Sequence, residues 1–68
     1  MTNNLTLLEI LHLYELGQIE QTKVLVNARK RYWLLLPKDT VVSHLLDNYS
    51  PYEVMTHCFI CDGVLYIG

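Results

Sequence analysis

Two cysteines with the spacing of a zinc site, Cys58 and Cys61, are the most specific chemical motif in this sequence. In a zinc knuckle such a pair lies on a tight turn, so that both sulfurs face one ion, and four ligands complete the tetrahedron. The sequence offers three histidines as further ligands: His12, His44 and His57. However, the Asp62-Gly63 pair that follows is a favoured turn of a two-residue hairpin. Cys58 and Cys61 would then lie on opposite faces of one strand.

We therefore predict that both thiols are structural, reduced and free of metal. A zinc-stabilised module through Cys58 and Cys61 is kept as the third interpretation of the chain. A catalytic site is not expected either, because the sequence contains no glycine-rich phosphate loop, no His-Glu-x-x-His motif and no paired-carboxylate spacing. The sequence predicts a non-enzymatic protein with no cofactor.

The second chemical feature is the basic run Arg29-Lys30-Arg31, which is followed directly by Tyr32 and Trp33. Cations beside aromatic rings can contact phosphates and stack on bases, and the same cations can face an acidic protein surface. All five basic residues lie between positions 23 and 38, a window without an acid, but the whole chain has a net charge of −2. That charge opposes the field that concentrates proteins on nucleic acid. We expect a protein partner with an acidic surface, and nucleic acid as the alternative.

Composition limits the class of protein that must position these residues. The chain has 68 residues, of which 51% are apolar, which excludes intrinsic disorder and indicates a single domain over residues 1–68. A domain of this size buries only about 60% of the surface of its unfolded chain, so some apolar surface is expected to meet a second chain. No apolar run approaches the roughly 20 residues that cross a bilayer, and no secretory signal is visible. A cytoplasmic protein without a membrane partner is expected.

Residues 5–16 are predicted to form a helix, with Asn4 as N-cap and Gly17 just after its end. One stripe at helical spacing is expected to face the core: Leu7, Ile10, Leu11 and Tyr14. A second set of leucines lies among the polar residues of the opposite side: Leu5, Leu8, Leu13 and Leu16. A helix that is apolar nearly all round is buried on more than one side. The second set therefore predicts a homodimer or a partner contact.

Residues 22–26 and 31–36 are predicted to be two strands of an antiparallel hairpin with a four-residue loop. A continuous helix over 22–36 is the competing interpretation, and Pro37 would end either element. A second helix is expected over 40–48, with Asp39 as its N-cap and an apolar stripe that includes Leu46.

The segment Ser50-Pro51-Tyr52-Glu53 has the form of a capping box with proline at the first helical position, and predicts a short third helix over about 51–56. Tyr49 and Tyr52 beside Pro51 are candidates for an exposed anchor patch. The last hairpin completes the order α-ββ-αα-ββ. This is an α+β domain in which an antiparallel sheet packs on helices.

The function predicted from these features is that of a small regulatory or inhibitory protein that acts by protein–protein interaction. In its compact size and its lack of a catalytic set, the chain resembles in general style the small regulatory proteins of phages and mobile elements. The residues expected to bind the partner are Leu5, Leu8, Leu13, Leu16, Arg29, Lys30, Arg31, Tyr49 and Tyr52.

Overall fold

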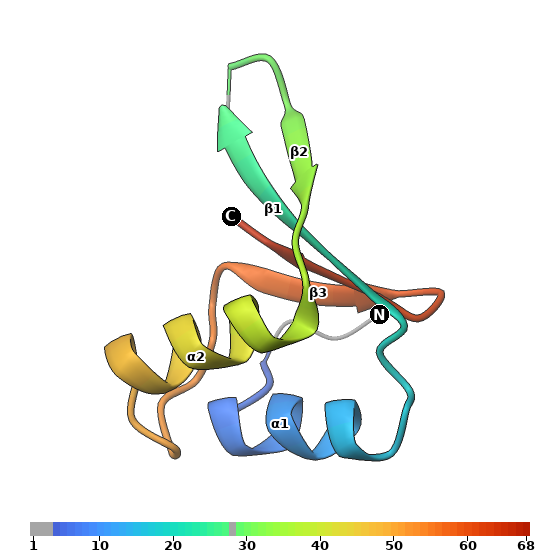
Figure 1. Ribbon diagram of the computed structural model, residues 1–68. Helices are drawn as coiled ribbons and strands as arrows, with labels where there is room; N and C mark the ends of the chain where they lie inside the picture. Colours follow the sequence, from blue (N-terminus) through green and yellow to red (C-terminus); the bar gives the residue numbers. More distant parts are fainter. Residues whose placement is uncertain (1–3, 28) are drawn as a thin grey trace.

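The computed structural model describes residues 4–27 and 29–68, and shows two helices beside a four-stranded sheet (Figure 1). The elements follow in the order α1 (Leu7–Glu15), β1 (Gln21–Asn27), β2 (Tyr32–Leu35), α2 (Lys38–Asn48), β3 (Cys58–Cys61) and β4 (Val64–Ile67). The predicted α+β class is confirmed, and so are both predicted hairpins. The alternative of one helix over 22–36 is wrong. Ala28, which belongs to the predicted loop of the first hairpin, lies outside the described residues.

The sheet has the strand order β2-β1-β4-β3 and is mixed. Each hairpin is antiparallel, but β1 and β4 pair in parallel, with Thr22 opposite Leu65 and Val24 opposite Ile67. The prediction of a wholly antiparallel sheet is therefore wrong at the central strand pair, β1 and β4. The reason is the connection between the hairpins: α2 and residues 49–57 carry the chain back along the sheet before β3 begins, so that β3 runs in the same direction as β2.

The core lies between the two helices and one face of the sheet. From α1, Leu7 and Ile10 are fully buried, and from β4 Leu65 is fully buried. The remaining buried apolar side chains are Tyr14, Ile19, Val41, Leu45, Met55 and Cys58. The stripe predicted on α1 is confirmed, with Leu11 partly buried at its margin. On α2 the structure corrects the predicted stripe, because Leu46 is 54% exposed.

One polar pair is built into this core. The hydroxyls of Tyr14 on α1 and Thr22 on β1 are 2.5 Å apart and form a buried hydrogen bond. A buried hydroxyl without a partner costs stability, whereas a paired one fixes the two elements in register. This bond positions α1 against β1.

The start of α1 differs from the prediction in its capping residue. Thr6, rather than Asn4, is the N-cap: its hydroxyl accepts a hydrogen bond from the backbone N–H of Glu9, and the Glu9 carboxylate accepts from the N–H of Thr6. Thr6-Leu7-Leu8-Glu9 is the capping-box pattern of this helix. Gly17, with φ of +72°, follows the helix as predicted.

The predicted third helix does not form. Pro51 and Tyr52 make a turn, and Val54 forms an isolated antiparallel bridge with Thr6. The first N–H groups of a helix have no partner inside it. Here the carbonyls of Glu53 and Pro51 accept hydrogen bonds from the N–H groups of Leu7 and Leu8, at 3.1 and 3.0 Å. This tertiary pairing replaces the local helix that the capping-box pattern indicated.

Both hairpin turns use left-handed backbone. Asp62 and Gly63 have φ of +51° and +78°, which is the turn type that the Asp-Gly pair predicts. In the first hairpin the register shifts between Leu25 and Asn27, which marks a bulge at Val26, and Arg31 has φ of +50°. A bulge increases local twist and redirects side chains, so the end of this hairpin is set apart from the flat part of the sheet.

Candidate functional site

The β1–β2 hairpin extends beyond the four-stranded part of the sheet (Figure 1). β4 pairs along β1 only as far as Val24, whereas β2 pairs with β1 as far as Asn27. The end of the hairpin therefore has no third strand beside it among the described residues. The exposed large apolar side chains of the whole hairpin are 45% to 60% exposed: Val26 and Tyr32 at this end, and Leu34 and Leu35 where β4 also pairs with β1.

The predicted basic run lies at the tip of this hairpin. Arg29, Lys30 and Arg31 are all exposed. The Asn27 side-chain oxygen accepts hydrogen bonds from the backbone N–H groups of Arg29 and Lys30, at 3.1 and 3.4 Å. This bonding organises the backbone of the tip and leaves the three cationic side chains free to meet another molecule. The structure thus joins the basic run to exposed apolar residues on one element.

An aromatic cluster occupies the sheet face opposite the helices, and sequence reasoning missed it. Trp33, Phe59 and Tyr66 come from three different strands. The rings of Phe59 and Tyr66 are stacked, with centroids 4.8 Å apart, and Trp33 meets Tyr66 edge-on at 5.1 Å. The Lys23 ammonium lies 5.9 Å from the Tyr66 ring centroid. The alternation of side chains along each strand indicates which face its aromatic residue occupies. Only the register between the strands brings the three rings together.

This cluster is a poor platform for nucleic-acid bases. Base stacking needs an aromatic ring whose flat face is free. The Tyr66 ring is already engaged by Phe59, by Trp33 and by the Lys23 ammonium. The three rings pack together across the sheet, from β2 over β1 to β4 and β3, on the face opposite the helices.

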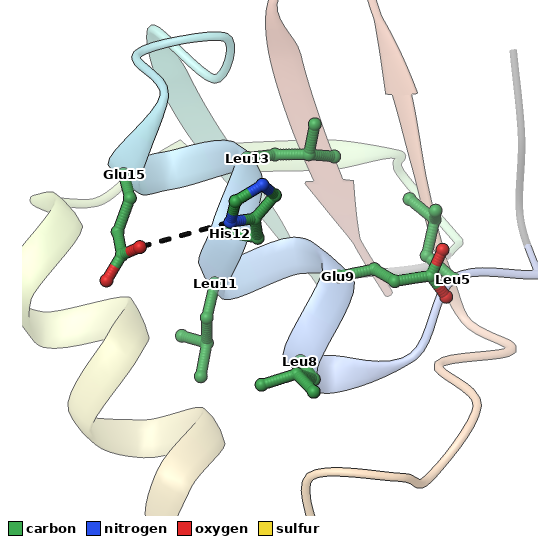
Figure 2. A pocket seen from close by; sticks show the side chains of 7 residues that line it. All are labelled: Leu5, Leu8, Glu9, Leu11, His12, Leu13 and Glu15. Atoms are coloured by element: carbon green, nitrogen blue, oxygen red, sulfur yellow. Dashed lines mark ion pairs between the residues drawn. The ribbon is translucent and has the colours of Figure 1, made fainter.

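The four leucines of the second predicted surface, on and beside α1, do not share one environment. Leu8 and Leu16 are 51% and 55% exposed, whereas Leu5 and Leu13 pack against the core. A hollow of about 640 Å³ lies over the outer side of α1. The residues that line it are Leu5, Leu8, Glu9, Leu11, His12, Leu13 and Glu15 (Figure 2). Leu16 does not belong to it.

The charges around this hollow are acidic. His12 Nδ1 lies 4.0 Å from Glu15 Oε2, and both side chains are well exposed. Figure 2 shows His12 between Leu11 on one side of the helix and Leu13 on the other. The α1 surface and the tip of the β1–β2 hairpin thus carry opposite charge. Both also carry exposed apolar side chains: Leu8 on α1, and Val26 and Tyr32 at the end of the hairpin.

The two tyrosines after α2 have different environments. Tyr49 packs against the core, whereas Tyr52 is 81% exposed. Because the Pro51 carbonyl accepts from the N–H of Leu8, the turn that carries Tyr52 lies against the start of α1. Of the predicted pair, Tyr52 alone remains available for a partner.

Cys58 and Cys61 lie on opposite faces of β3, as the Asp62-Gly63 turn predicts. Cys58 is 2% exposed, and its thiol donates to the Met55 carbonyl at 3.3 Å. Cys61 is exposed, with its sulfur 3.9 Å from an oxygen of the neighbouring Asp62 carboxylate. Two side chains on opposite faces of one strand cannot share an ion. Within residues 4–27 and 29–68, no group of three His, Cys, Asp or Glu side chains could hold a metal.

Comparison with protein-family models, with curated proteins and with solved structures finds no match to this chain. Among the described residues, neither α1 nor α2 is long and apolar enough to cross a membrane.

The two cysteines should differ sharply in reactivity. Burial raises the pKa of the Cys58 thiol, and the thiolate is the reactive form. Iodoacetamide at neutral pH should modify one thiol in the native protein, at Cys61, and two after unfolding, as read by mass spectrometry. Cys61→Ser should abolish the native reaction, and Cys58→Ser should leave it unchanged. Equal protection of both thiols, relieved by a chelator, would instead indicate a metal site.

Proposed function

We propose that the protein is a small, non-enzymatic regulatory protein that inhibits a protein partner by covering an acidic surface of it with the β1–β2 hairpin. One observation carries the proposal: the basic run and the largest group of exposed apolar side chains lie on the same projecting element. Interface energy concentrates in a few residues, and aromatic and arginine side chains are enriched among them. Tyr32, Arg29 and Arg31 supply these residue types at the tip of the hairpin.

Charge supports an acidic partner. Lys23 and the three cations of the tip lie on the hairpin, and the chain has no acid between residues 23 and 38. Opposite charges across an interface speed encounter and select among partners, while the apolar residues between them supply binding energy once desolvated. Tyr32 follows the cations of the tip directly, whereas Leu34 and Leu35 point to opposite faces of the hairpin. A partner that reaches the tip therefore meets the cations and Tyr32 together.

Nucleic acid is the second candidate, and the basic run favours it. Three exposed cations at the tip could contact few phosphates, and affinity for nucleic acid depends strongly on how many are contacted. The aromatic cluster, which would otherwise strengthen this candidate, has its central ring engaged by protein side chains. A zinc-stabilised module is the third candidate, and the opposite orientation of Cys58 and Cys61 weighs against it.

The α1 surface supports a second element of the proposal, a homodimer. Leu8 and Leu16 remain exposed after the core is filled, and a self-complementary two-fold contact is the simplest way to cover them. In this arrangement each protomer would keep its β1–β2 hairpin free for the regulated partner.

The hairpin proposal is tested by capture from a lysate of the source cells, with and without nuclease. The variant Arg29→Ala with Arg31→Ala should weaken capture of a stoichiometric protein partner at least about tenfold, a loss of about 1.4 kcal/mol. Its matched control is Gln18→Glu with Thr56→Glu, which lowers the net charge equally at exposed sites away from the tip. The control should bind like the wild type.

Two outcomes would contradict the proposal. The first is a bound protein that disappears after nuclease treatment. The second is a mobility shift of random single-stranded or duplex DNA or RNA in the nanomolar range at physiological salt, lost in the Arg29→Ala, Arg31→Ala variant. Either result would place nucleic acid first.

The dimer has its own prediction. Sedimentation equilibrium of the wild type should give a dimer, and Leu8→Glu with Leu16→Glu should give a folded monomer, because the added carboxylates charge the contact on both protomers. Leu46→Glu, at an equally exposed leucine of α2, is the control and should remain dimeric. A wild-type monomer at high concentration would show that these leucines are not a dimer contact.

A further inference from the structure

The outer edge of β2 is open and apolar. β2 is at one end of the strand order, and among the described residues it pairs as a strand with β1 alone. Its sequence is Tyr-Trp-Leu-Leu, and Tyr32, Leu34 and Leu35 are 60%, 45% and 57% exposed. Natural proteins block such edges with lysine, proline or inward charges, or keep the edge strand short and bulged, because an open edge is a template for another strand. β2 is short, with four residues, and the β1 bulge lies at its tip end. No residue from 32 to 35 is a lysine, a proline or another charged residue.

The hydrogen bonds of the hairpin show which backbone groups face outward. The N–H of Leu36 donates to the carbonyl of Thr22 at 3.1 Å, and Val24 lies opposite Leu34. In an antiparallel pair, alternate residues direct both their N–H and their C=O groups toward the neighbouring strand. Leu34 and Leu36 therefore bond to β1. Trp33 and Leu35 direct their N–H and C=O groups to the open edge.

The charge beside this edge is concentrated at its tip end. Arg29, Lys30 and Arg31 precede the strand and are exposed, whereas the Lys23 ammonium lies over the Tyr66 ring and the Lys38 ammonium over the Tyr14 ring. An added strand that carries carboxylates would be attracted where it passes the tip. Cross-strand pairs of opposite charge each stabilise a sheet by about 0.2–1 kcal/mol.

A second copy of this chain fits the edge poorly in the register centred on Leu34. If two β2 strands paired antiparallel about a two-fold axis between their Leu34 residues, Trp33 would pair with Leu35 of the second copy. Arg31 of each copy would then lie beside Pro37 and Lys38 of the other. Like charges would meet at both ends of the pairing, and like charges opposite each other destabilise a sheet.

We propose that the open edge of β2 is a strand-addition site that takes an extended, acidic segment of the protein partner. The partner's backbone would pair with the N–H and C=O groups of Trp33 and Leu35, and its carboxylates would face Arg31 and the other cations of the tip. Main-chain bonding supplies affinity in this mode, and side chains of alternate residues supply selectivity. The inference rests on the proposed function and adds to it the conformation and charge of the segment that is bound.

The probe for this site is a fluorescein-labelled octapeptide that alternates Glu and Val, and its counterpart with Lys in place of Glu is the charge control. Fluorescence anisotropy should show binding of the Glu peptide to the wild type, with at least about tenfold weaker binding of the Lys peptide. The Glu peptide with all its amides N-methylated keeps its side chains but loses its donors, and should not bind. Absence of binding by the unmethylated Glu peptide overturns the proposal.

The matched protein variants separate backbone pairing from side-chain docking. Leu35→Pro removes an outward N–H but no bond to β1, and proline is tolerated where the N–H faces away from the sheet. It should abolish binding of the Glu peptide. Leu35→Thr keeps the N–H and suits a strand, and should bind within about threefold of the wild type.

The outcomes distinguish this inference from the proposed function. If Leu35→Pro and Leu35→Thr lose peptide binding equally, or if the N-methylated peptide binds as well as the Glu peptide, the contact is through side chains and strand addition is wrong. In that case capture that still depends on Arg29 and Arg31 would leave the proposed function standing. If Leu35→Pro instead converts a dimer to a monomer, the edge is occupied by a second copy, and the acidic partner is overturned.

Discussion

The parallel pairing of β1 with β4 is the constraint on which the rest of the structure depends. A two-stranded hairpin is at best marginally stable alone, whereas a sheet of three or more strands with an apolar face can be stable. The pairing of Gln21–Val24 with Val64–Ile67 makes one sheet from two hairpins. It places Thr22 beside Leu65 on the face that both helices cover, where Thr22 bonds to Tyr14 of α1. Without this pairing the two helices would have no common surface to cover.

The same pairing determines which surfaces remain exposed for binding. β4 pairs with β1 only as far as Val24, so the end of the β1–β2 hairpin has no third strand beside it. Because β1 and β4 are the central strands, β2 lies at an edge of the sheet. The one projecting element is also the one that carries the basic run. On the open face, Phe59, Trp33 and Tyr66 engage one another. The surfaces left for binding thus include the hairpin tip, the sheet edges at β2 and β3, the outer leucines of α1 and Tyr52.

Local signals in the sequence predicted the elements well where one residue pair decided the geometry. Asp62-Gly63 predicted the second hairpin, its register predicted Cys58 and Cys61 on opposite faces, and the spacing of apolar residues predicted the core stripe of α1. The prediction failed where a distant segment competed with a local pattern. Residues 51–56 have the sequence of a helix start, but the carbonyls of Pro51 and Glu53 accept hydrogen bonds from the first N–H groups of α1 instead. The parallel strand pair and the aromatic cluster depend on which hairpin edges meet, and no local pattern encodes that.

Amide hydrogen exchange along β2, measured residue by residue by NMR, tests the central claim that this edge is open and available to a partner. In the free protein, the N–H groups of Trp33 and Leu35 should exchange rapidly and those of Leu34 and Leu36 slowly, because only the latter pair bonds to β1. With the Glu–Val octapeptide at saturation, Trp33 and Leu35 should become protected and Leu34 and Leu36 should change little. Equal protection of all four residues in the free protein, or exchange at Trp33 and Leu35 that the peptide leaves unchanged, would contradict it.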